Sequence, residues 1–274
     1  MGPPSSNRAF STLIGISAGV AAFGILSGCG GGVPLLHPAH VLPAGRTAFA
    51  VGVSDRFLLG DAQRALAGTE PAVPGTPDDP NRRATRSALV TLAEGPAVAP
   101  YAAARIGIPG ANEAGLSYSG PALRGDLRHA FDWGDYALSA GLGVTGRFGQ
   151  RSTDLPPEVD LSGSHGVGVD LPLLLGYRTD ADLISVWGGV RGSFDQWWGS
   201  VSLDPNAAYE LDARRLSVGP IFGMSVGLPP FWVSVELELD YAHVTGSLDR
   251  PGTRLQAQID GWSARPAGAL TAKF

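Results

Sequence analysis

The fourteen residues FWVSVELELDYAHV, at positions 231–244, decide the fold. Their polarity alternates at every step, so one face is apolar and the other is largely acidic. Side chains of a β-strand alternate between two faces, whereas a helix would mix the two sets, so the stretch is predicted to be a strand. The apolar face is about ten residues long, the length that a tilted strand needs to cross a bilayer, and it begins and ends with an aromatic ring. That face consists of Phe231, Val233, Val235, Leu237, Leu239 and Tyr241.

The same alternation recurs in GVGVDLPLLLGY (166–177), LSVGPIFGMSVGL (216–228) and DYALSAGLGVTGRFG (135–149). A soluble β-sandwich would also alternate. It would not normally combine an apolar stripe framed by aromatic residues with so much Gly, Ser and Arg on the opposite face. We therefore predict an all-β protein, a closed antiparallel transmembrane β-barrel.

Ten strands are predicted, an even number as bacterial single-chain barrels use. Short connections follow every second strand, and longer ones lie at the other end, where the connection 120–122 is the exception. Eight strands is the alternative if the third and fourth predicted strands are one long strand. The predicted strands are 45–54, 98–107, 113–119, 123–131, 135–149, 165–178, 183–198, 209–228, 231–246 and 258–274.

Composition limits the function. The chain has 274 residues and a formal charge of −5, with 20 Lys plus Arg against 25 Asp plus Glu, so nucleic acid is not an expected partner. The single cysteine excludes an intramolecular disulfide and any multi-cysteine metal site. His37 and His40 alone are too few to predict a metal site, and no cofactor is expected.

The one cysteine, Cys29, closes the sequence Leu-Ser-Gly-Cys after an uncharged run at 9–25 that is typical of a signal peptide. This sequence resembles a bacterial lipobox. The resemblance implies cleavage before Cys29 and acylation of that residue, hence an anchor in the periplasmic leaflet of the outer membrane. Ordinary signal-peptidase cleavage and an uncleaved anchor are the alternatives. We thus divide the chain into a signal peptide (1–28), a flexible periplasmic tether (29–44) and the barrel (45–274).

The end of the chain, GALTAKF at 268–274, places Gly268, Leu270, Ala272 and Phe274 on one face. It resembles the last strand of bacterial outer-membrane β-barrels, in which a C-terminal aromatic residue forms part of the insertion signal. The resemblance extends over 45–274 in strand pattern and indicates no subfamily. It implies Phe274 as the insertion signal, with outer-membrane lipid and the barrel-assembly machinery as partners.

The inward face is predicted to carry many charges that satisfy one another, because small barrels are filled by their own side chains. If Phe231 pairs near Phe274, Asp240 lies opposite Arg265. Gly219 would then lie beside Asp240, and Arg191 could reach across it. We expect a luminal charge network of Arg191, Glu236, Glu238, Asp240 and Arg265. The other inward charges are Arg105, Glu113, Arg124, Asp126, Arg128, Arg147, Asp170, Arg178, Asp195 and Arg215.

The long outer loop, 55–97, contains two stretches with helical spacing that either fold across the barrel mouth or lie on the surface. Omptin-like barrel proteases place acidic residues and a histidine at the outer rim. Here Asp240 and His243 are three residues apart, so an unbroken strand directs them to opposite faces; His165 is the other candidate. We expect no catalytic residues and a structural or surface-interaction role. A narrow solute channel and a rim hydrolase are the alternatives.

Overall fold

The computed structural model describes residues 33–67, 80–94, 98–148, 160–179, 182–204 and 207–274. The predicted signal peptide and Cys29 lie outside these residues. No helix among the described ranges is long and apolar enough to cross a membrane.

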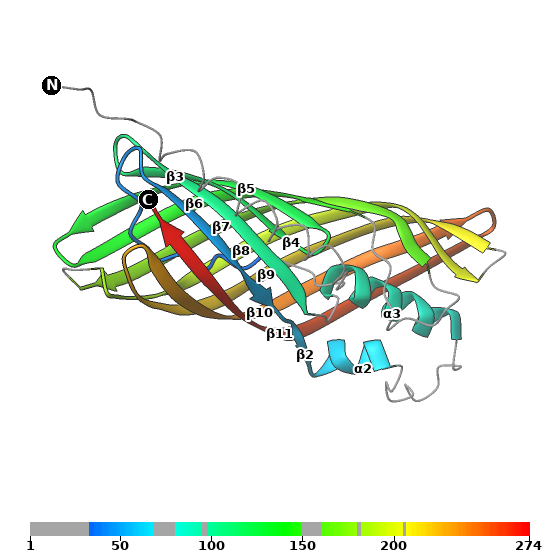
Figure 1. The fold of residues 1–274 in the computed structure, drawn as a ribbon. Coiled ribbons are helices and arrows are strands. Elements are labelled where there is room, and N and C mark those ends of the chain that lie inside the picture. Colours follow the sequence, from blue (N-terminus) through cyan, green and yellow to red (C-terminus); the bar gives the residue numbers. More distant parts are fainter. Residues whose placement is uncertain (1–32, 68–79, 95–97, 149–159, 180–181, 205–206) are drawn as a thin grey trace, which may run out of the picture.

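Ten antiparallel strands form a closed ring in which each strand pairs with the next, and β1 pairs with β11 to complete the wall (Figure 1). The prediction of a ten-stranded barrel is confirmed, and the eight-stranded alternative is wrong. A further short strand, β2 (Phe57–Leu59), pairs with β11 beyond the end of β1. The ring consists of β1 (Thr47–Ser54), β3 (Ala99–Ile108), β4 (Asn112–Ser119), β5 (Ala122–Trp133), β6 (Tyr136–Arg147), β7 (Asp160–Arg178), β8 (Ile184–Asp204), β9 (Ala207–Leu228), β10 (Phe231–Arg250) and β11 (Thr253–Lys273).

The two ends of the barrel differ. At the turn end, short connections follow β3, β5, β7 and β9. β1 begins and β11 ends at this same end, where Thr47 and Phe274, the residue after β11, exchange backbone hydrogen bonds. At the opposite, loop end lie the connection from β1 to β3 and the helices α2 (Asp61–Ala67) and α3 (Pro80–Glu94).

The wall has an apolar outside and a polar inside. In β10, Val233 is 58% exposed on the outer face, whereas Glu238 is 2% exposed on the inner one. A soluble protein would bury the first set and expose the second. The inversion is what a hydrocarbon surround and a filled lumen require, because lipid solvates the apolar face and the charges must find partners inside.

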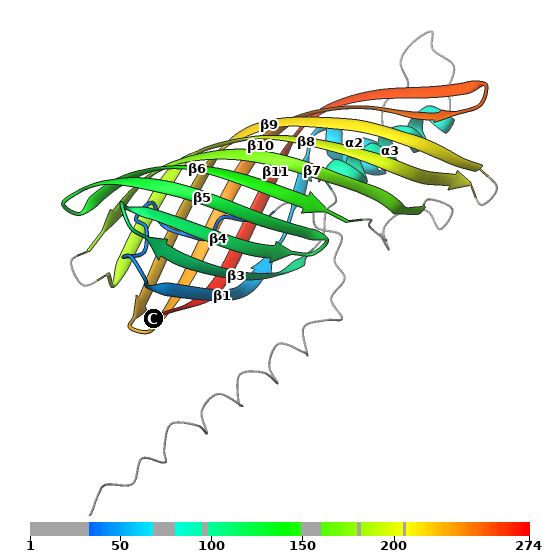
Figure 2. The same cartoon turned by 90° about the horizontal axis from the view of Figure 1, so that it is seen from above.

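Strand length divides the wall into a short side and a long side. β1 and β3–β6 have 8 to 12 residues, whereas β7–β11 have 19 to 22. Figure 2 shows the long strands continuing past the short ones toward α2 and α3. The long strands extend farther at the loop end than predicted: β8 and β10 end later, and β7, β9 and β11 begin earlier, so parts of 150–164, 199–208 and 247–257 are strand.

Aromatic residues frame the outer face at both ends. At the turn end Trp133, Tyr136, Phe231 and Phe274 are exposed. Toward the loop end Trp198, Tyr241 and Trp262 are exposed as well. Trp197 and Tyr209, at the same end, instead face inward. Neighbouring strand residues must point to opposite sides, so Trp197 and Trp198 could not both contact lipid.

The loop end of the lumen is filled by a hydrophobic core. Helices α2 and α3 pack their buried faces against inward side chains of the long strands. Of the two alternatives left open for these stretches, the structure shows the one in which they lie across the barrel mouth. The buried members are Leu58, Ala62, Ala65, Ala88, Leu89, Val90, Leu92, Ala93, Leu161, Trp197, Val201, Tyr209, Leu211, Ala213, Val244, Leu248 and Ile259.

Candidate functional site

The interior of the barrel holds one continuous network of ion pairs, contributed by every ring strand except β1. Seven arginines alternate with six carboxylates, and each member contacts the next. In order the network runs Arg128, Glu113, Arg105, Asp126, Arg124, Asp170, Arg191, Glu238, Arg265, Asp240, Arg215, Asp195 and Arg147. Every one of these side chains was predicted to face inward.

The network is possible because each carboxylate is shared between two arginines. Arg124 donates to both oxygens of Asp170 at 2.9 Å, a bidentate pair. A Cβ on Gly143 would lie 2.4 Å from Asp170 and 2.5 Å from Arg124, so the glycine leaves room for this pair. Charges buried in this way need partners on every side, which the alternation supplies.

Four of the five residues predicted as a network come together, with one exchange of partners, whereas Glu236 does not join them. Arg265 donates to Glu238 at 2.6 Å and to Asp240 at 2.7 Å. Arg191 bonds Glu238 rather than Asp240, and Asp240 takes its second bond from Arg215 at 3.2 Å. The predicted register was two residues out: Phe231 pairs with Ala272, so Glu238 lies opposite Arg265.

Glu236 lies apart from the network and binds a segment that was predicted to be a periplasmic tether. Residues 33–46, the luminal segment, enter the barrel at the turn end, where 43–46 are exposed, and continue inside it. Residues 33–44 thus do not form the flexible tether predicted for 29–44. The backbone N–H groups of Leu35 and Leu36 donate to the two oxygens of Glu236, each at 2.8 Å. Leu36 has a φ of 49°, in the left-handed region, which turns both N–H groups toward the one carboxylate.

Three further charged residues hold the luminal segment. Arg191 donates to the carbonyl of Val33 at 2.9 Å, and Glu113 accepts from the N–H of Leu42 at 2.8 Å. Arg128 donates to the carbonyls of Pro38 and His40. Together with those to Glu236, these bonds link the segment to β4, β5, β8 and β10, which explains why a proline-rich stretch is ordered here.

His37 lies in the middle of the luminal segment, 4% exposed. Arg128 donates to its Nδ1 at 2.8 Å, so the proton of the neutral ring is assigned to Nε2. Burial, and then the nearby Arg128, hold the pKa of His37 well below its ordinary value. Burial also lowers the pKa of His40, with Arg178 contributing. Within the described residues, no group of His, Cys, Asp or Glu is placed to hold a metal ion.

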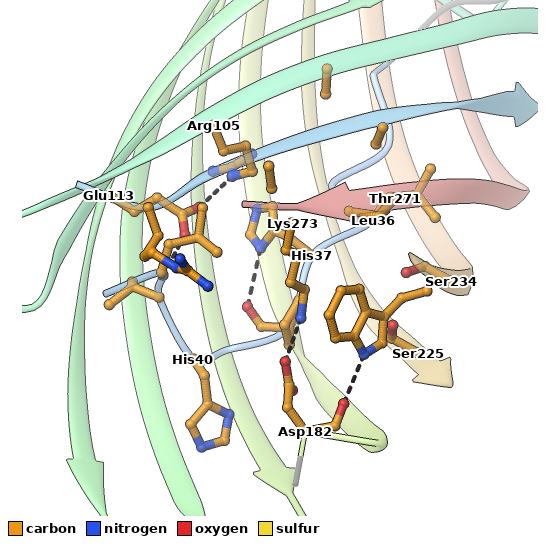
Figure 3. Close-up of a pocket in the computed structure, with 18 of the residues that line it drawn as sticks. Leu36, His37, His40, Arg105, Glu113, Asp182, Ser225, Ser234, Thr271 and Lys273 are labelled. Atoms are coloured by element: carbon orange, nitrogen blue, oxygen red, sulfur yellow. Dashed lines mark hydrogen bonds and ion pairs between the residues drawn. The ribbon is translucent and has the colours of Figure 1, made fainter. Parts of the chain in front are cut away.

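A cavity of about 340 Å³ separates the luminal segment from the wall at the turn end (Figure 3). Arg105 and Glu113 lie on one side of it, and Ser225 and Ser234 on the other. Lys273, the only lysine of the chain, pairs with Asp182 at 2.7 Å at its mouth. Deeper in the lumen, among Arg191, Asp195 and their neighbours, the free space is about 10 Å³, room for about one water molecule.

The rim residues considered for catalysis do not converge. Asp240 is buried in the network, whereas His243 lies on the outer face and contacts Asp260 at 2.6 Å, so the two point to opposite sides of the wall as predicted. His165 packs edge-on against Trp198, with ring centroids 5.1 Å apart.

No protein-family model and no curated protein matches the chain. Several solved bacterial outer-membrane barrels are similar. The attachment invasion locus protein Ail of Yersinia pestis is 11% identical, over 84% of this chain and 99% of Ail, with a TM-score of 0.33. OprG of Pseudomonas aeruginosa is 9% identical over 85% and 97%, with a TM-score of 0.37. The outer-membrane protease OmpT of Escherichia coli is 12% identical over 86% and 100%, with a TM-score of 0.34. The strand pairing within this chain, and not these similarities, shows that the barrel is closed.

Proposed function

We propose that the protein is a sealed, non-catalytic β-barrel of the bacterial outer membrane with a structural or surface-interaction role. The single observation that carries this proposal is that described parts of the chain occupy the lumen at three levels, although a cavity of about 340 Å³ remains at the turn end. The luminal segment occupies the turn end, the ion-pair network the middle, and α2 and α3 the loop end. Such a barrel serves as an anchor rather than as a path for solutes.

The surface available for interaction is the loop-end head, which we define as the loop-end parts of β8–β11 together with α2 and α3. Single-chain bacterial barrels place short turns in the periplasm and longer loops outside. The turn end is therefore assigned to the periplasm and the loop-end head to the cell exterior. Protease added to intact cells should cut within 55–97 and spare the turns near 110 and 229; the reverse pattern would contradict the orientation.

Conductance of the purified full-length protein in planar bilayers tests the sealing. Wild type should show no unitary conductance in concentrated KCl. A variant without residues 33–44 is the matched control, because it removes the material that fills the turn end and leaves every strand intact. Heat-dependent gel mobility checks that both fold. Steady open-channel steps from the wild type would overturn the proposal and favour the channel.

The proposal also includes a lipid anchor at Cys29 and an insertion signal at Phe274. Acylation of Cys29, with loss of residues 1–28, is tested by intact-mass spectrometry of membrane-extracted protein; an unmodified chain that begins elsewhere would exclude it. Phe274, 56% exposed at the turn end, is offered as part of the insertion signal. Its deletion should impair assembly by the barrel-assembly machinery into outer-membrane lipid, and normal insertion without it would exclude this role.

A further inference from the structure

The luminal segment runs through the barrel in one direction. At the turn end, Gly45 and Arg46 exchange backbone hydrogen bonds with Gly107. Leu42 then bonds Glu113, the second residue of β4 from that end. Leu36 and Leu35 bond Glu236, the sixth residue of β10. Each step toward the N-terminus thus lies farther from the turn end.

The last described contact lies level with the far rim of the short side. Val33 bonds Arg191, the eighth residue of β8 from the turn end, whereas β1 has only eight residues in all. Val33 also belongs to an apolar cluster that includes Ala122, the first residue of β5 at the loop end, and Ala267, which pairs with the last residue of β1. The segment therefore climbs from the turn end to the loop-end rim of the short side.

The remaining chain is too short to return. Cys29 lies four residues before Val33, and an extended chain of that length spans at most about 14 Å. The seven strand residues between Arg191 and the turn end of β8 cover roughly 23 Å, or about 18 Å of height at a tilt of about 40°.

We propose that the luminal segment threads the barrel from the turn end to the loop-end rim of the short side, so that an acyl group on Cys29 enters the outer leaflet. The leaflet predicted from sequence was the periplasmic one, and the direction of the luminal segment is the reason for the change. The barrel is then threaded by its own N-terminal region, with the lipid anchor and the C-terminus on opposite sides of the membrane. The inference rests on the orientation given under the proposed function.

The scarcity of lysine provides a direct test. Lys273 marks the turn end, and two single variants each add one amine. Gly31→Lys adds it before the luminal segment, and Ala44→Lys adds it at an exposed position of the turn end. Cells are treated with a membrane-impermeant amine-acylating reagent, with or without permeabilisation of the outer membrane, and the labelled peptides are identified by mass spectrometry.

The amine introduced by Gly31→Lys should be labelled to the same extent with and without permeabilisation. Lys273 and the amine introduced by Ala44→Lys should be labelled only after permeabilisation. If all three require permeabilisation, the chain does not thread the barrel and the inference is overturned. If Lys273 and the Ala44 position are labelled in intact cells while the Gly31 position is not, the orientation is wrong but the threading stands. The same spectra report whether Cys29 carries acyl chains.

Discussion

Arg191 reaches Glu238 across an entire strand. The two residues lie on β8 and β10, and their Nη1 and Oε2 atoms are 3.3 Å apart. The strand between them, β9, presents Gly219 at this point, paired with Arg191. A Cβ on Gly219 would lie 1.7 Å from the carbonyl oxygen of Leu239, so no side chain fits there.

Gly219→Ala should therefore destabilise the barrel by about 1–3 kcal/mol, the usual cost of overpacking. Gly192→Ala is the matched control, because its Cβ would meet nothing nearer than the carbonyl oxygen of Ser217, at 4.0 Å. Urea unfolding in lipid vesicles measures both. Equal stability of the two variants would mean that the close approach at Gly219 relaxes without cost.

Arg265→Ala should cost about 3–5 kcal/mol, because it leaves two buried carboxylates short of a partner. The double variant with Asp240→Ala should cost less than the sum of the two single ones. Arg254 and Asp249, 3.4 Å apart and largely exposed, form the control pair, for which about 0–1 kcal/mol is expected. Small, additive effects at Arg265 and Asp240 would indicate a water-filled lumen.

His37 should make stability depend on pH. Its pKa is lowered in the folded protein by burial and by Arg128, so below about pH 6.5 the unfolded chain binds more protons than the folded one. The stability that the neutral ring contributes is present above that pH and is lost as the pH falls toward the lowered pKa. His37→Gln should flatten this part of the curve of unfolding free energy against pH. Parallel curves for wild type and variant would exclude His37 as the cause.

Leu89→Ala should loosen the loop-end head without disturbing the ion-pair network. Leu89 is 1% exposed in the core between α3 and the long strands, and a cavity of this kind costs about 2–5 kcal/mol. Leu216→Ala, on the outer face at 61% exposure, creates no internal cavity and serves as the control. Hydrogen exchange should increase in α3 for the first variant only; unchanged protection there would show that the helix is held by other contacts.

The strands could be predicted from sequence because the membrane enforces the alternation at every residue. The start and end of β10 illustrate the limit of this rule. Its start at Phe231 was predicted correctly, since an aromatic residue marks the lipid boundary there. Its far end, at Arg250, was missed by four residues, because beyond the lipid the outer face is polar and the contrast between the two faces fades.

The luminal segment could not be predicted from its composition. Its three prolines are typical of a linker, and its order comes from bonds to Glu236 and Arg128, which are distant in sequence. One signal was present: Leu35 and Leu36 are apolar residues that a solvated tether would not need. The luminal charges were easier to predict, because the alternation of side chains along each strand shows which residues face inward.

The strand pair that closes the barrel, β1 with β11, is the shortest pairing in the wall. β1 and β11 pair over seven residues, against twenty between β10 and β11. Lateral opening of the barrel should therefore begin with the separation of β1 from β11. Because β1 follows directly on the luminal segment, β1 cannot swing outward without pulling residues 33–46 away from Glu113 and Arg128. The luminal segment should therefore oppose separation of β1 from β11, because that separation would also break buried hydrogen bonds far from the pair.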